Sequence, residues 1–158
     1  NKMRILVEGL LEQGRQVRLL VGDQGDLGAV KDLHARLRHR DAGNVIFEPP
    51  ASLNALMQQI ALTDIVVASR YHNIVCALAM TRPAISIGYA KKNDALLNDT
   101  GLGAYCHHIE TFNPEHLLGQ IDQIFACRAQ LVTEVARGVT IYRHRLEQQE
   151  EVLRRMVS

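Results

Sequence analysis

The sequence predicts an α/β protein with a Rossmann-like parallel sheet flanked by helices. Short apolar runs alternate with amphipathic helical stretches about every twenty residues, and strands joined by helices form right-handed crossovers between parallel strands. The run at 64–68 is rich in β-branched residues and ends in small ones, which is typical of a strand covered on both faces. A long amphipathic stretch follows residue 127, and we expect it to form one C-terminal helix.

Local signals place the individual elements. Gly14 follows an amphipathic stretch and is a typical helix stop, because glycine adopts the left-handed conformation easily. Ser52 is a suitable N-cap, and Asn113 followed by proline marks another helix start. We expect strands at 16–21, 44–47, 64–68, 84–87 and 104–107, and helices at 5–14, 30–38, 52–62, 73–80 and 93–99, from 113 and after 128.

The domain organisation follows from the change of pattern near residue 128. We expect residues 1–127 to form a Rossmann-like domain and residues 128–158 to form a helical extension. The extension has an apolar stripe that can pack on this domain or on a further one, or pair as a short coiled coil. Because the sequence opens inside a helical pattern, we expect it to be a fragment of a longer protein.

Composition narrows the function classes. The chain has 158 residues, 47% of them hydrophobic, which suits one domain with a real core. It carries 18 Lys and Arg against 17 Asp and Glu, so its near-zero net charge argues against binding to nucleic acid or anionic membranes. No apolar run is long enough to span a membrane, and we expect no signal peptide. We expect Cys76, Cys106 and Cys127 to be buried free thiols in a reducing compartment.

Two basic segments follow neighbouring strands. Ser69, Arg70, Tyr71 and His72 come directly after the strand at 64–68, and the carboxyl ends of parallel strands face ligand crevices. Arginine offers a planar fork of donors to a carboxylate or phosphate, and histidine can add a donor or move a proton. The alternative is structural: Arg70 would pair with a carboxylate at a helix end, and His72 would cap the following helix.

The second basic segment, 88–94, contains Tyr89, Lys91 and Lys92 and follows the strand at 84–87. A lysine there would contribute a positive charge to an anion site, and a helix starting near Asn93 would contribute backbone donors. Alternatively, both lysines are solvated residues that flank a turn. We expect the two basic segments to face the same crevice.

Other motifs are weaker. The loop at 22–28 fits neither the dinucleotide fingerprint nor the P-loop, and its aspartates would repel phosphate, so we expect it to form a crevice wall. His107 and His108 are adjacent on an expected strand and point to opposite faces, so we expect no metal site. No hydrolase nucleophile elbow is present.

The segment 64–103 resembles the polysaccharide pyruvyl transferase family. The resemblance rests on Ser69-Arg70-Tyr71-His72, on the small-residue helix that follows, on the strand after Arg82-Pro83, on Tyr89-Ala-Lys-Lys92-Asn-Asp94 and on Gly101-Leu-Gly103. Tyr71 stands where the family commonly has an aliphatic residue. Outside this segment the similarity is architectural.

The resemblance implies the C-terminal, donor-binding half of a two-domain enzyme with a GT-B fold. It implies transfer of pyruvate from phosphoenolpyruvate to a sugar or lipid-linked oligosaccharide as a ketal, in bacterial exopolysaccharide biosynthesis, with no cofactor besides this donor. Arg70 and His72 would hold the donor, His72 would also act as the general acid, and Tyr89 and Lys92 would line the pocket. We expect a cytoplasmic protein that the lipid-linked acceptor brings to the inner membrane face, and an inactive fragment when the N-terminal domain is missing.

Two other functions remain open from the residues alone. A nucleotide-sugar-binding domain of a GT-B glycosyltransferase would share the architecture, although no obvious acidic residue for a ribose follows the relevant loops. A non-catalytic interaction module would use the C-terminal helix to bind a partner.

Overall fold

A computed structural model describes residues 2–37 and 43–157 of the chain. Arg38, the last residue of the helix predicted at 30–38, lies outside the described residues. The strands, all short, are β1 (Val17–Leu19), β2 (Val45–Phe47), β3 (Val66–Ala68), β4 (Ala84–Gly88) and β5 (Cys106–His108). The α-helices are α1 (Lys2–Glu12), α2 (Leu27–Leu37), α3 (Leu53–Ala61), α4 (Tyr71–Ala79), α5 (Lys91–Asp99), α6 (Pro114–Ala126) and α7 (Arg128–Val157); the 3-10 turns η1 (Gln24–Asp26) and η2 (Gly103–Tyr105) complete the described elements.

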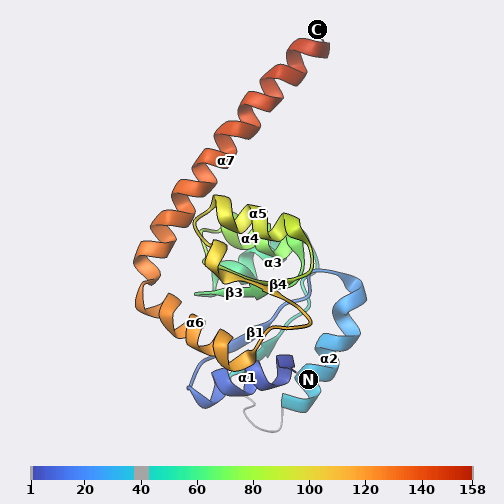
Figure 1. Ribbon diagram of the computed structural model, residues 1–158. Helices are drawn as coiled ribbons and strands as arrows, with labels where there is room; N and C mark the ends of the chain where they lie inside the picture. The colour runs from blue at the N-terminus through green and yellow to red at the C-terminus, as the bar shows by residue number, and fades with distance from the viewer. Residues whose placement is uncertain (1, 38–42, 158) are drawn as a thin grey trace.

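The predicted α/β class is confirmed, and all described strand pairs are parallel. Helices cover both faces of the strands: α4 and α5 lie on one side of β3 and β4, and α1 and α6 lie on the other (Figure 1). The long helix α7 runs away from this layered body (Figure 1). The alternation of strand and helix therefore gives the layered arrangement that right-handed crossovers require.

The strands form two parallel sheets and not the single sheet that the sequence predicts. One sheet pairs β1 with β2, and the other has the order β3-β4-β5. A cavity of about 1110 Å³ lies between β1 and β3, so these two strands do not pair. The cavity also explains why Ile65 and Val67 of the central strand segment are only half-buried, although the sequence predicts a strand covered on both faces.

Each sheet has its own hydrophobic core. The larger core surrounds β3 and β4 and includes Ile60, Ile74 and Ile85, each of which is fully buried. The smaller core joins α1 and α2 to the sheet of β1 and β2 through Val7, Leu11, Leu19, Leu37 and Val45. The two helices α1 and α2 therefore pack on the same face of their sheet.

Three predicted helix boundaries are confirmed. Gly14, just after α1, has a φ of +74°, the left-handed conformation expected of a helix stop. The Ser52 hydroxyl accepts a hydrogen bond from the amide of Ala55 at the start of α3. The Asn113 side chain accepts from two amides of α6, and proline occupies the first turn.

Other boundaries move by a few residues. The helices α4 and α5 each begin two residues earlier than predicted, so Tyr71, His72, Lys91 and Lys92 lie in first turns and not in loops. The predicted strand at 104–107 is displaced to Cys106–His108, because η2 occupies the residues before it. Hydrophobic periodicity predicts whether a segment is a helix or a strand better than it predicts where the segment begins and ends, because residues at the ends of helices and strands also tolerate irregular conformations.

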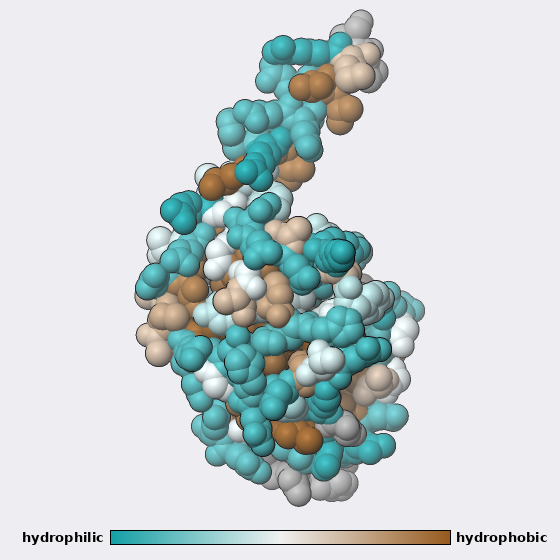
Figure 2. Space-filling view, in the orientation of Figure 1, coloured by the Kyte–Doolittle hydropathy of each residue, from teal (hydrophilic) through white to brown (hydrophobic). Residues whose placement is uncertain are grey.

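Helix α7 begins inside the core and ends outside it. Leu131 and Val135 are buried in the larger core. Gly138 allows a close approach, because a Cβ at this position would lie 2.8 Å from the Cα of Thr100. Beyond it, Leu146, Val152 and the residues around them are exposed, and Figure 2 shows hydrophobic and hydrophilic patches along this protruding part. The first turns of α7 therefore pack with the core of the preceding residues, while its later turns do not. The division at residue 128 into a domain and an extension stays a prediction.

Two further observations bear on the sequence predictions. No helix in the described ranges is both long enough and apolar enough to cross a membrane. The three cysteines are free thiols, but only Cys76 is buried; Cys106 and Cys127 are half-buried, so the expectation of burial was wrong for these two. Burial raises the pKa of the Cys76 thiol, which makes it a poor nucleophile.

Candidate functional site

The first part of the candidate site is the turn between β3 and α4. Arg70 is the N-cap of α4, with extended backbone angles (φ −87°, ψ 132°), and its side chain makes no capping hydrogen bond. Ser69 and Arg70 are exposed, and α4 starts with Tyr71 and His72 in its first turn. The free amides at a helix start carry partial positive charge, so this turn presents donors at the carboxyl end of β3.

The second part is the turn between β4 and α5, and it has the same construction. Ala90 is the N-cap of α5 and has no side chain that could accept a hydrogen bond from the first amides. The helices α3 and α6, which follow β2 and β5, are by contrast capped by the side chains of Ser52 and Asn113. Because β3 and β4 are parallel neighbours, the two starts without side-chain caps lie at the same edge of the sheet. The pair is suited to an anionic ligand.

The guanidinium of Arg70 is held by Asp26 at the end of η1. Nε of Arg70 donates to Oδ2 of Asp26 at 2.8 Å, and Nη2 donates to Oδ1 at 2.6 Å. This hydrogen-bonded pairing lowers the pKa of the Asp26 carboxyl and raises the pKa of Arg70. The arginine has therefore found a carboxylate partner, as the structural alternative from the sequence proposed. It also remains 45% exposed, with three of its five N–H donors outside this pairing.

The loop at 22–28 supplies this partner and forms a wall beside the turn, as the sequence predicts. Gly22 and Asp26 line the cavity together with Ser69 and Arg70. Asp23 accepts a hydrogen bond from the amide of Gly25 at 2.7 Å, which closes the small turn before η1. This local cap orients the loop so that Asp26, and not Asp23, meets the arginine.

The side chains of Lys92 and Tyr71 link the two helix starts. The ammonium group of Lys92 on α5 lies 4.6 Å from the ring centroid of Tyr71 on α4, at cation–π distance. The ring of Tyr71 also packs edge-on against His72, with the ring centroids 6.0 Å apart. His72 is exposed in the first turn and gives no capping bond to α4, unlike the role considered for it. Tyr89 is 77% exposed in the loop before α5.

A buried amide, which sequence reasoning missed, fixes the two turns to one another. Asn93 is 1% exposed, and its Nδ2 donates to the Ser69 carbonyl at 3.3 Å and to the Ser86 hydroxyl at 3.2 Å. Gly88 leaves room for this amide, because a Cβ there would lie 2.8 Å from Nδ2. The signal in the sequence was a serine inside an apolar strand, since a buried hydroxyl needs a partner.

The structure therefore brings all six predicted site residues to one edge of the sheet, carried by the paired strands β3 and β4. Ser69, Arg70, Tyr71 and His72 come from the first turn, and Tyr89 and Lys92 come from the second. On the neighbouring strand β5, Nε2 of His107 is 2.6 Å from Oε1 of Gln120, and His108 is in register with Gly88. Among the described residues no group of acidic, histidine and cysteine side chains is placed to hold a metal ion.

Comparison with known proteins places this chain in a family. The family model for polysaccharide pyruvyl transferase matches residues 2–91, more than half of the chain. The match runs from α1 through β4 and includes every predicted site residue except Lys92, which follows it directly. Searches of curated proteins and of solved structures gave no match. The chain belongs to the polysaccharide pyruvyl transferase family.

Proposed function

We propose that this chain is the donor-binding part of a pyruvyl ketal transferase and that it binds phosphoenolpyruvate at the starts of α4 and α5. The observation that carries the proposal is the pair of helix N-termini without side-chain caps at the carboxyl ends of adjacent parallel strands, with Arg70 at one and Lys92 at the other. Phosphoenolpyruvate carries a phosphate and a carboxylate on a small rigid frame. Two cationic centres beside two sets of backbone amides match these two groups.

Arg70 would bind one of the two anionic groups while Asp26 holds it in place. The ion pair occupies Nε–H and one hydrogen of Nη2, so the rest of the guanidinium fork is free to meet the ligand. Asp26 reduces the local positive charge but fixes the direction of the fork. A ligand that meets an oriented arginine avoids the entropy cost of ordering that side chain.

Lys92 would bind the other anionic group together with the first amides of α5. Its ammonium group lies over Tyr71, so it is already near the start of α4. Tyr89, exposed in the loop before α5, would cover the bound donor from outside. The Asn93 amide holds the two turns at a constant separation, which a ligand with two fixed anionic groups requires.

His72 would be the general acid. In ketal formation the oxygen of one sugar hydroxyl adds to C2 of phosphoenolpyruvate and releases its proton, while C3 accepts a proton from the general acid and becomes a methyl group. The C2–O bond to phosphate then breaks, the oxygen of the second hydroxyl bonds to C2 and closes the ring, and phosphate leaves with the proton of that second hydroxyl; the proton of the first hydroxyl restores the general acid. A histidine in the first turn of α4, beside the proposed donor site, is placed to supply the proton to C3.

The acceptor would be a sugar of a bacterial exopolysaccharide or of its lipid-linked precursor, bound by a second domain as in a GT-B enzyme. Family membership supports transfer to a polysaccharide over the nucleotide-sugar and interaction-module alternatives. With the acceptor domain supplied by another part of the protein, the chain by itself would bind the donor without turning it over.

Calorimetric titration of the chain with phosphoenolpyruvate tests the proposal. We expect saturable binding, and Arg70→Ala should weaken it about 10- to 100-fold because charge-assisted hydrogen bonds are lost. The matched control is Arg154→Ala, which removes the same group from a helix-surface pair on the protruding part of α7 and should leave affinity unchanged. UDP- and GDP-sugars should not bind. Equal binding by wild type and Arg70→Ala would contradict the proposal.

A further inference from the structure

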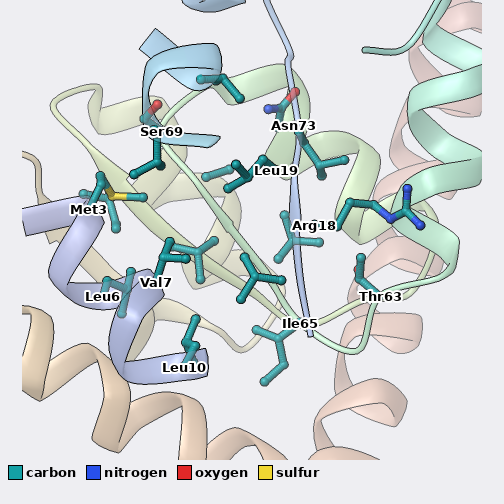
Figure 3. A pocket seen from close by; sticks show the side chains of 18 of the residues that line it. Met3, Leu6, Val7, Leu10, Arg18, Leu19, Thr63, Ile65, Ser69 and Asn73 are labelled. Atoms are coloured by element: carbon teal, nitrogen blue, oxygen red, sulfur yellow. The ribbon is translucent and has the colours of Figure 1, made fainter. Parts of the chain in front are cut away.

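The cavity between the two sheets has the size and the surroundings that one further β-strand would need. Leu19 on β1 lines one side, and Val66 on β3 lines the other. Apolar side chains of α1, including Met3, Leu6 and Leu10, cover the space between them, as Figure 3 shows. A five-residue strand with one strand spacing on its edges and one sheet spacing across its faces takes up on the order of 800 Å³. The cavity volume of about 1110 Å³ accommodates it.

Both bordering strands direct backbone groups into this cavity. The amide of Val17 donates to the carbonyl of Asn44 at 2.8 Å, toward β2, and the amide of Val66 donates toward β4. Successive residues of a strand direct their amides to opposite edges, so the amides of Arg18 and Val67 face the cavity. No strand pairing joins β1 to β3 in the described ranges. Two parallel strand edges with free donors and acceptors face one another across apolar space, which no apolar ligand would satisfy.

The crossover rule gives the same position to a strand that would precede α1. The helices α1 and α2 share the core of the smaller sheet, so they lie on one face of it. The connection from β1 through α2 leads to β2. If the connection through α1 has the same right-handed sense, the strand before α1 must border β1 on the side away from β2. That side is the cavity.

The start of α1 lies at the correct edge for a short connection from such a strand. Nζ of Lys2, the first residue of α1, donates to the carbonyl of Glu110 at 2.6 Å, and Glu110 follows β5. The helix therefore starts at the carboxyl edge of the sheet, where a strand parallel to β1 and β3 would end.

A buried hydrogen-bond acceptor without a described partner, Oδ1 of Asn73, also lies at this edge. Oδ1 of Asn73 has no hydrogen-bond partner among the described residues, the side chain is 7% exposed, and it lines the cavity (Figure 3). It lies close to Gly22, where a Cβ would come within 2.1 Å of it. An unpaired buried acceptor is costly, and a backbone amide arriving in the cavity would satisfy it.

We propose that polypeptide preceding Lys2 forms a parallel strand in this cavity, hydrogen-bonds to both β1 and β3, and merges the two sheets into one six-stranded sheet. The new strand takes the central position, between β1 and β3. Its carboxyl end reaches the edge where Asp26 and Arg70 line the cavity, so the connection into α1 forms part of the wall of the candidate site. The inference rests on strand geometry and holds whichever ligand the site binds.

Amide hydrogen exchange by NMR tests this in the protein that carries its natural residues before Lys2. We expect the amides of Arg18 and Val67 to exchange as slowly as those of Val17 and Val66, which the present hydrogen bonds already protect. In the 158-residue chain, Arg18 and Val67 should exchange faster by on the order of 100-fold or more. The amides of Val17 and Val66 are the internal controls, since they belong to the same strands.

Two outcomes would overturn the proposal. Fast exchange at Arg18 and Val67 in the extended protein, beside protected Val17 and Val66, would show that no strand pairs with these edges. If instead the amides of Arg18 and Val67 are protected in the 158-residue chain, and this protection increases with protein concentration, a second copy of the chain fills the cavity. Sedimentation velocity on the same samples separates the second outcome from a monomer.

Discussion

Asp26 and Arg70, 44 residues apart in sequence, form a two-point ion pair that ties the loop after β1 to the turn after β3. The two strands belong to different sheets, so this pair bridges the mouth of the cavity between them. The pairing sets the direction of the arginine at the candidate site. The candidate site therefore depends on this loop through the Asp26–Arg70 pair. No other predicted site residue forms a described hydrogen bond with the loop.

Replacing Asp26 tests the pH dependence of this pair. The folded-state pKa of Asp26 is lowered, so its stabilising contribution is present above the unfolded-state pKa of about 4 and is lost as pH falls through the lower folded value. We expect Asp26→Asn to be less stable than wild type at pH 7, with a difference that shrinks as the pH falls below about 4. Urea denaturation across this range measures the difference. Asp23→Asn, which can keep the η1 cap and leaves the Arg70 pair intact, is the control.

A stability gap between wild type and Asp26→Asn that stays constant from pH 7 to pH 2 would contradict the ion-pair explanation. Such a gap would mean that the substitution acts through packing of the loop and not through charge.

Replacing Asn93 tests the connection between the two turns. Asn93→Ala leaves the Ser86 hydroxyl and the Ser69 carbonyl without their donor, and both contacts involve a side chain that is almost fully buried. We expect a loss of about 1–3 kcal/mol in the free energy of unfolding, measured by urea denaturation. Asn54→Ala makes the same substitution at an exposed position in the first turn of α3 and should change stability by less than about 0.5 kcal/mol. Equal effects of the two substitutions would argue against a structural role for the Asn93 amide.

Two glycine substitutions test how α7 approaches the core. In Gly138→Ala the new Cβ would meet the Thr100 backbone at 2.8 Å, so we expect overpacking to cost about 1–3 kcal/mol. In Gly119→Ala, on α6, the new Cβ meets nothing within 4 Å, so better helix propensity should stabilise by about 0.5–1 kcal/mol. Thermal unfolding compares the two variants with wild type. Stabilisation by both would mean that α7 does not contact Thr100.

Tyr142 should ionise well above the usual range of a tyrosine. Burial, together with its hydrogen bond to Asp99 at 2.7 Å, raises the pKa of Tyr142 to about 12. Absorbance titration of the phenolate should show a late step near pH 12 that disappears in Tyr142→Phe. Because the folded pKa exceeds the unfolded value of about 10, this group's contribution to stability is lost as pH rises above 10. A late step that persists in the variant would assign it to another tyrosine.

The sequence was sufficient to predict the fold class and the two turns of the site, because both depend on local patterns. Periodicity distinguishes helix from strand within a short window, and the caps at Ser52 and Asn113 are single-residue signals. The helix starts at Tyr71 and Lys91 were placed two residues late, since the first turn of a helix carries no periodic signal of its own.

Contacts between segments that are distant in the sequence could not be predicted from it. A helix-end carboxylate was considered as the partner of Arg70, but nothing local identifies Asp26, because the pairing depends on how the loops after β1 and β3 meet. The separation of the two sheets likewise depends on which strands become neighbours, which strand composition does not encode. The Asn93 amide could have been suspected from Ser86, yet its second acceptor is a backbone carbonyl that no sequence pattern marks.

The most direct test of the proposed donor site is a crystal structure of the chain with phosphoenolpyruvate bound. The account predicts one anionic group of the ligand within hydrogen-bond distance of the Arg70 guanidinium and the other at the first amides of α5 beside Lys92. Phosphoenolpyruvate bound away from these two helix starts, or no bound ligand at saturating concentration, would contradict it.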